Sequence, residues 1–253
     1  MTLDELRKLP HWSYSAISTY LNCSLQYRFR YVDRAESESS SACFAFGRAF
    51  HAAMSYYAMH LDNGFFDVFR DVFKLEVEAT PNLVFKSGED FDSMLNTGMK
   101  MLATARENWL DTDHVSGVAV PFKVEVPGLS RPLIGEYDLL LNDGGSTVIV
   151  DWKTAAAKWT VGKAGHDLQA TAFCYAYAKE HGENPLFRFD VVTKTKNPSF
   201  TSHWTTRTGE DFRRFELLAK KVDEAVNKGV FLPCETSFSC AACPYSDKCR
   251  NWR

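Results

Sequence analysis

The sequence predicts an α/β (α+β) protein, in which a small mixed sheet is flanked by helices and preceded by an N-terminal helical part. Three observations lead to this fold class. Apolar residues recur at helical spacing through residues 1–112, alternating and β-branched runs begin after residue 113, and the end of the chain is rich in cysteine. We therefore expect a helical region at 1–112, a core containing the sheet at 113–230 and a cysteine-rich tail at 231–253.

The first region is expected to be helical throughout. Helical spacing of apolar residues recurs in residues 13–33, 47–61, 65–78 and 89–110. Ser13 or Ser15 is available as the N-cap of the first segment. The polar run RAESESSSA separates the first two segments and is expected to be a loop.

The next three runs have the pattern of strands joined by hairpins. They are VSGVAVPFKVEV, PLIGEYDLLLN and STVIVDWKT, and Pro-Gly and Asp-Gly-Gly turn signals separate them. We expect these strands to pair antiparallel. A helix at 165–180, strands at 186–194 and 200–206, and an amphipathic helix at 209–228 complete the predicted core.

Composition narrows the class of protein. The chain has 253 residues, of which 45% are hydrophobic and 24% charged, so it can bury a full core. No apolar stretch is long enough to cross a bilayer, and the first residues, MTLDELRKLP, lack the apolar centre of a secretory signal. We therefore expect no membrane association and a location in the cytoplasm, or in the host cytoplasm if a phage encodes the chain.

Charge and missing motifs exclude further classes. The formal net charge of −3 provides no global basic field, so any contact with nucleic acid must use local cations. The sequence contains no Walker A loop, no GxGxxG turn after a strand, no HExxH and no GxSxG. It therefore lacks the signatures of P-loop ATPases, dinucleotide-binding domains, zincins and α/β-hydrolases.

Two acidic residues lie on neighbouring predicted strands. Asp138 lies in GEYDLLL, and Asp151 precedes Lys153 in VIVDWKT. A hairpin through residues 142–146 would bring the carboxylates side by side, where they repel each other and favour Mg²⁺ or Mn²⁺. Such an ion can polarise a phosphodiester and activate a water, which Lys153, on the same face as Asp151, can orient. DxK is common by chance, but the apolar run VIV before it indicates a buried charge that needs a partner.

Two further polar residues are candidates for this site. His51 follows Gly47 by four residues, so both lie on one helix face, and the glycine would permit close approach of another element. A single histidine on a helix is more often an ordinary surface or core residue, with its hydrogen bonds made to protein or water, than a metal ligand. Gln169, on the helix after the DxK strand, could position substrate or water, although such glutamines are usually solvated.

Together, GxxxH at 47–51, GxxD at 135–138, DxK at 151–153 and the following glutamine resemble the RecB-like branch of the PD-(D/E)xK nuclease superfamily. The resemblance is closest to the CRISPR-associated RecB-like nucleases and the AddB-type iron–sulfur nuclease domains. It implies a restriction-endonuclease-like core. It also implies a metal site formed by His51, Asp138, Asp151 and the backbone carbonyl of Trp152. The catalytic residues that it implies are Asp138, Asp151, Lys153 and Gln169.

The chain departs from this family at one position. The family often shows QxxxY after the DxK strand, whereas Gln169 is followed four residues later by Phe173. Tyr177, eight residues on and near the same helix face, could substitute.

The cysteines suggest a second metal centre. Seven cysteines are many for a reducing compartment, where crowded thiols indicate metal rather than disulfides. Cys240, Cys243 and Cys249 need a fourth ligand. Cys234 would complete a local set suited to Zn²⁺. The resemblance favours Cys23 instead, with a 4Fe-4S cluster that joins the two ends of the chain.

The expected function is that of a metal-dependent DNA exonuclease acting on single-stranded ends, in recombination, repair or CRISPR spacer acquisition. The alternative is a DNA-end binding or adaptor subunit of an integrase or helicase complex, with secondary nuclease activity. A zinc-binding interaction module would require the acidic strand ends to be coincidental. Sequence-independent DNA contacts are expected from Lys153, Lys158, Lys163, Lys194, Lys196 and Trp159.

Overall fold

The computed structural model describes residues 1–109, 114–235 and 238–252. The helices are α1 (Leu3–Arg7), α2 (Tyr14–Asn22), α3 (Ser24–Tyr27), α4 (Ala42–His60), α5 (Phe65–Ala79), α6 (Phe91–Glu107), α7 (Leu168–His181), α8 (Gly209–Asn227) and α9 (Ser246–Arg250). Short turns are the π-helical η1 (Arg28–Val32) and the 3₁₀ helices η2 (Lys163–His166) and η3 (Phe238–Ala242). The strands are β1 (Trp12–Ser13), β2 (Ser40–Ser41), β3 (Leu83–Val84), β4 (Val115–Val124), β5 (Leu133–Asp143), β6 (Ser146–Ala155), β7 (Leu186–Thr193) and β8 (Phe200–Thr205).

A mixed sheet forms the centre of the molecule. Its strands follow the order β1-β5-β6-β7-β8, and β4 pairs with β5. The pairs β4–β5 and β5–β6 are antiparallel, as predicted, whereas β7 lies parallel to β6. A parallel pair needs a long crossover, which the segment containing α7 supplies. The predicted fold class, a mixed sheet flanked by helices, is confirmed.

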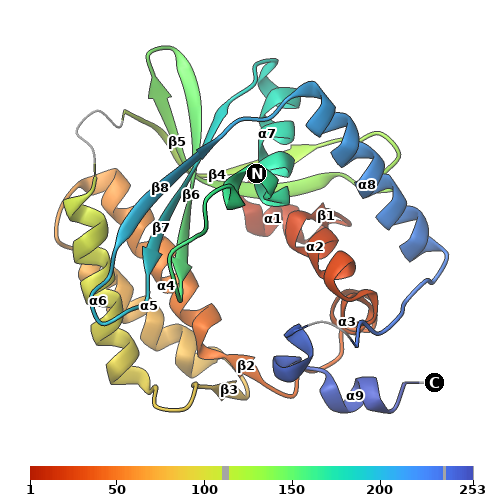
Figure 1. The fold of residues 1–253 in the computed structure, drawn as a ribbon, viewed down its shortest axis with the longest axis horizontal. Helices are drawn as coiled ribbons and strands as arrows, with labels where there is room; N and C mark the ends of the chain where they lie inside the picture. Colours follow the sequence, from red (N-terminus) through yellow and green to blue (C-terminus); the bar gives the residue numbers. More distant parts are fainter. Residues whose placement is uncertain (110–113, 236–237, 253) are drawn as a thin grey trace.

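Helices cover both faces of the sheet and bury separate cores (Figure 1). On one face, α2, α7 and α8 share an apolar cluster with β4 to β7. On the other face, α4, α5 and α6 share a second cluster with β5 and β6. No helix among the described residues is long and apolar enough to cross a membrane.

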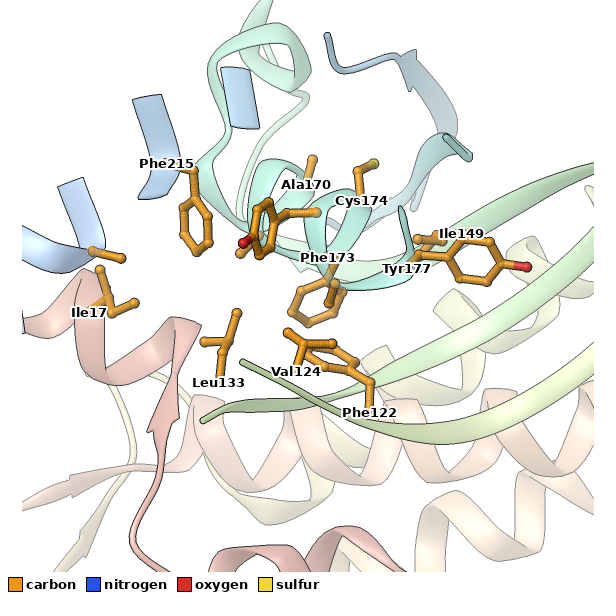
Figure 2. Packing of buried hydrophobic residues seen from close by; sticks show 14 of the residues in the cluster. Ile17, Phe122, Val124, Leu133, Ile149, Ala170, Phe173, Cys174, Tyr177 and Phe215 are labelled. Carbon is orange, nitrogen blue, oxygen red and sulfur yellow. The ribbon is translucent and has the colours of Figure 1, made fainter. Parts of the chain in front are cut away.

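Helix α7 is buried on most of its surface, which fixes its position over the strands. Phe173 contacts Phe122 and Tyr137, with ring centroids 5.3 and 5.8 Å apart. Figure 2 shows Phe173 directed toward Phe122 and Val124. Because α7 is held along its length, the residues in its first turn have a defined position beside β6.

The structure corrects two predicted helix boundaries. Residues 13–33 do not form one helix, because Cys23 adopts an extended conformation, with φ −163°, and divides α2 from α3. Ser13 is the N-cap of α2, as predicted, and its hydroxyl accepts from the amide of Ala16 at 3.2 Å. The serine-rich run ends in β2, and α4 begins at Ala42, before the predicted start at Gly47.

A buried carboxylate joins β1 to α8. Asp223 is 4% exposed and accepts from Trp12 Nε1 at 2.7 Å, from Ser130 Oγ at 2.6 Å and from Asn227 Nδ2 at 2.9 Å. Removing the carboxylate would leave the indole N–H and the hydroxyl without a partner.

We expect Asp223→Ala to reduce the free energy of unfolding by about 3 kcal/mol, or to lower Tm by about 10 °C. Thermal unfolding followed by circular dichroism measures this loss. Asp223→Asn, which keeps an acceptor oxygen, should lose less. An Asp223→Ala protein as stable as the wild type would contradict the assignment.

Candidate active site

The strands β5 and β6 separate at the two predicted acidic residues. Their ladder ends at the pair Leu139↔Val150, so Asp138 and Asp151 lie just beyond its last pair. The amide of Trp152 donates instead to Asp138 Oδ2 at 3.0 Å. Because the N–H and C=O of a strand residue point to the same side, the carbonyl of Trp152 also faces the Asp138 side.

His51 approaches from α4. Its Nδ1 lies 3.1 Å from Asp138 Oδ2, and its ring meets Trp152 edge to face at 6.2 Å. The expected role of Gly47 is wrong, because a Cβ added there would meet nothing within 4 Å. His51 therefore reaches the site through the position of α4 on the sheet, and no close approach at Gly47 is needed.

Lys153 and Gln169 surround Asp151 from the α7 side. Lys153 Nζ lies 2.5 Å from Asp151 Oδ2 and donates to Gln169 Oε1 at 2.9 Å. Gln169 Nε2 donates to Asp151 Oδ1 at 2.5 Å. Lysine, carboxylate and amide thus form a closed set of contacts, in which each side chain orients the other two.

The backbone around Gln169 is held by two polar residues. Asp167 is the N-cap of α7, and its carboxylate accepts from the amides of Gln169 and Ala170. Arg207, 3% exposed, donates to the carbonyls of Ala164 and Asp167. Sequence reasoning missed Arg207, because a lone arginine after a strand carries no signal of its role.

Burial and neighbouring charges shift the acid–base properties of the site. Burial lowers the pKa of His51, but the Asp138 carboxylate outweighs it and raises the pKa. Burial raises the pKa of Asp138, but His51 outweighs it and lowers the pKa. At Asp151, burial raises the pKa; Lys153 opposes this, and the like charge of Asp138 adds to it, so the pKa is raised. Asp151 is therefore poorly stabilised as an anion by the protein alone.

The residues fit a divalent cation. Asp151 is 2% exposed, and its Oδ2 is contacted by the Lys153 ammonium at 2.5 Å. Two oxygen-donor side chains, an imidazole and a carbonyl converge here, which is a donor set for Mg²⁺ or Mn²⁺. In the described ranges, no three His, Cys, Asp or Glu side chains form a group that could by itself hold a metal ion.

Tyr177 does not substitute for the missing family tyrosine. Its hydroxyl lies 2.8 Å from Thr147 Oγ1 at the start of β6 and donates to Glu183. An α-helix rises about 1.5 Å per residue, so Tyr177 lies about 12 Å along α7 from Gln169.

Two residues near the site were not predicted. Glu136 lies two residues before Asp138 on β5; burial raises its pKa, and the Asp138 charge adds to this. The strand period of two could have indicated it. Tyr14, at the start of α2, also lies within electrostatic range of Asp167, Lys153 and Asp151. No local signal marks Tyr14, because β1 and β5 pair across a long stretch of chain.

Several predicted DNA-contact residues gather beyond the end of β6. Lys153, Lys158, Trp159 and Lys163 line a cavity of about 490 Å³. The ring of Trp159 packs on that of Phe189, with centroids 4.9 Å apart. Lys163 Nζ lies 4.0 Å from the centroid of the Trp159 ring. A base could stack on this ring only by displacing Lys163.

Cysteines from both ends of the chain lie against one small apolar cluster. Cys23, Cys243 and Cys249 pack against Leu25, Phe29 and Tyr245, and Figure 1 shows α3 beside the C-terminal segment. Burial raises the pKa of Cys249, and the neighbouring thiols of Cys23, Cys243 and Cys240 raise it further. Among the described residues, no disulfide links any of the cysteines.

Comparison with known proteins agrees with this geometry. A family model described as the PD-(D/E)XK nuclease superfamily matches residues 11–250. The "Gene 69 protein" of Mycobacterium phage D29 is 24% identical over 277 residues, which cover 96% of this chain and 97% of that protein. The crystal structure of a "Putative exonuclease" from Eubacterium rectale has a TM-score of 0.62 at 17% identity, covering 99% of this chain and 91% of that one.

Proposed function

The chain belongs to the PD-(D/E)XK nuclease superfamily, and from this membership we propose that it is a Mg²⁺- or Mn²⁺-dependent DNA exonuclease acting on single-stranded ends. The observation that carries the proposal is the separation of β5 and β6 at Asp138 and Asp151, with Lys153 and Gln169 in contact with Asp151. Carboxylates at one end of a hairpin, with a lysine beside them, suit hydrolysis of a phosphodiester.

The residues that would hold the metal are His51, Asp138, Asp151 and the carbonyl of Trp152. When bound, a divalent ion polarises the phosphodiester and lowers the pKa of a water. The burial of Asp151 beside the like charge of Asp138, which raises its pKa, supports its assignment as a ligand, since a cation would compensate both effects.

The remaining polar residues would position the attacking water and the catalytic side chains, and would stabilise the charge that develops on the phosphate. Lys153 can orient the attacking water and offset the charge that develops on the phosphate oxygens. Gln169 accepts from Lys153 and donates to Asp151, so it keeps the ammonium and the carboxylate in one orientation. Arg207 and Asp167 hold the first turn of α7, which carries Gln169.

The biological setting is proposed more broadly as recombination, repair or CRISPR spacer acquisition. The phage relative supports action in a bacterial host cytoplasm. The second candidate function is a DNA-end binding subunit of an integrase or helicase complex with secondary nuclease activity.

We also assign a 4Fe-4S cluster to Cys23, Cys240, Cys243 and Cys249. Cys23 and Cys240 lie within electrostatic range of both Cys243 and Cys249, which supports this set. Thiolates are the ligands of iron–sulfur clusters. Cys234 is the alternative fourth ligand, in a Zn²⁺ site; its carbonyl accepts from Cys240 Sγ at 3.1 Å.

The experiment that tests the exonuclease proposal compares linear and circular single-stranded DNA of one sequence. With Mg²⁺ or Mn²⁺, the linear strand should be degraded to short products while the circle persists, and EDTA should stop the reaction. Degradation of the circle at the same rate would exclude an exonuclease. Tight binding of ends without degradation would favour the adaptor function.

A further inference from the structure

A cavity of about 620 Å³ is lined by Asp138, one of the two proposed catalytic carboxylates, and by Gln169. It lies along one edge of β5, where β1 pairs with residues 133–134 and β6 pairs with residues 139–143. Between these two partners, residues 135–138 have a paired neighbour only on the β4 side. The end of β1 and the start of α2, into which it leads (Figure 1), form one wall of the cavity through Ser13, Tyr14 and Ser15.

Tyr14 lies on this wall, with Asp138 and Gln169 on the same cavity. Its phenol is partly buried against the core and lies within electrostatic range of Asp151 and Lys153. Burial raises the pKa of Tyr14, and the neighbouring Ser18 side chain lowers it in part. Because Tyr14 lines the cavity and stays protonated at neutral pH, its hydroxyl can donate a hydrogen bond to a ligand there.

Cations line the outer part of the same cavity. Arg30 is exposed, its guanidinium lies 5.4 Å from the ring centroid of Tyr31, and it makes no ion pair among the described residues. Arg7 is also present but is paired with Asp4 at 3.3 Å. The acidic groups of the cavity, Glu136 and Asp138, lie at the β5 edge.

We propose that this cavity binds the phosphates of a single nucleic-acid strand next to the cleavage site, with Tyr14 donating a hydrogen bond to one phosphate and Arg30 pairing with another. The inference rests on the proposed nuclease function and deepens it by naming where the substrate lies. A planar guanidinium and a phenol donor suit phosphate oxygens. A cavity of this volume accommodates a ligand of small-molecule size, and so one or two nucleotides, but not a duplex.

Fluorescence anisotropy with a labelled eight-residue oligothymidylate tests the proposal. The titrations contain EDTA, so that no strand is cut. Tyr14→Phe removes only the phenol oxygen and should weaken binding about fivefold. Arg30→Gln should weaken binding about tenfold and reduce the salt dependence by about one phosphate contact. Lys100→Gln, at an exposed position on α6, is the charge-matched control and should bind as the wild type does.

The Tm and the visible absorbance of Tyr14→Phe and Arg30→Gln should equal those of the wild type, which would show that both variants keep the fold. Unlabelled single strands should displace the probe, and a blunt duplex of equal length should not. Wild-type affinity in both variants, or equal competition by the duplex, would overturn the inference even if the protein degrades DNA. If the variants bind weakly while the wild type degrades nothing, the inference stands and the nuclease function fails.

Discussion

Replacing Asp151 with asparagine is expected to abolish DNA degradation without destabilising the protein. The rate should fall by at least about a thousandfold, which corresponds to about 4 kcal/mol of transition-state stabilisation. Asparagine keeps the shape of the side chain and one oxygen, but it loses the negative charge that a divalent ion requires.

The effect on stability should be absent or favourable. Asp151 is 2% exposed and lies beside the like charge of Asp138, so its ionised form is costly to bury. Initial rates on end-labelled single-stranded DNA with Mn²⁺, together with Tm in EDTA, measure both effects. Asp92→Asn, at an exposed position on α6, serves as the charge-matched control. Wild-type rates in Asp151→Asn would sink the catalytic assignment.

Replacing Cys23 with serine is expected to remove the cluster and to loosen both ends of the chain. Cys23 lies between α2 and α3, whereas the other three proposed ligands lie near α9. Loss of one thiolate should bleach the broad visible absorbance of the purified protein. It should also lower Tm by about 10 °C, because the free energy of metal binding stabilises the folded chain.

Cys234→Ser is the matched control for this prediction. It replaces a cysteine of the same tail and should keep both colour and stability. Bleaching in Cys234→Ser but not in Cys23→Ser would contradict the proposed set. A colourless, zinc-containing wild-type protein, purified without air, would exclude iron–sulfur altogether.

The sheet and the acidic centre could be predicted because their signals are local. Alternating runs separated by Gly-rich turns indicated β4, β5 and β6, and their antiparallel order followed from the hairpins. The proximity of Asp138 and Asp151 then followed from the same hairpin. Lys153 contacts Asp151 because strand residues two apart share a face.

The features that could not be predicted depend on contacts between distant segments. The strand β1 is two residues long and exists only because Trp12 pairs with Leu133. The parallel pairing of β7 with β6 depends on the crossover through α7. The break at Cys23 has no Gly or Pro to announce it, and there Leu25 and Ser24 hydrogen-bond to the backbone of Leu232 instead.

The same reasoning explains which site residues were missed. Tyr14 reaches the active site only through β1, and Arg207 only through the loop before α7. The position of Tyr177 was misjudged because two residues that share a helix face can still lie two turns apart along the axis, here about 12 Å.

The central claim is that a divalent ion is held where β5 and β6 separate, and Mn²⁺ binding measured by electron paramagnetic resonance tests it most directly. The signal of free Mn²⁺ should fall on titration with the wild-type protein. Asp138→Asn and Asp151→Asn should each weaken the affinity at least about tenfold, since each removes a charged ligand. Lys100→Gln should bind as the wild type does. Equal affinity in the wild type and both aspartate variants would contradict the account.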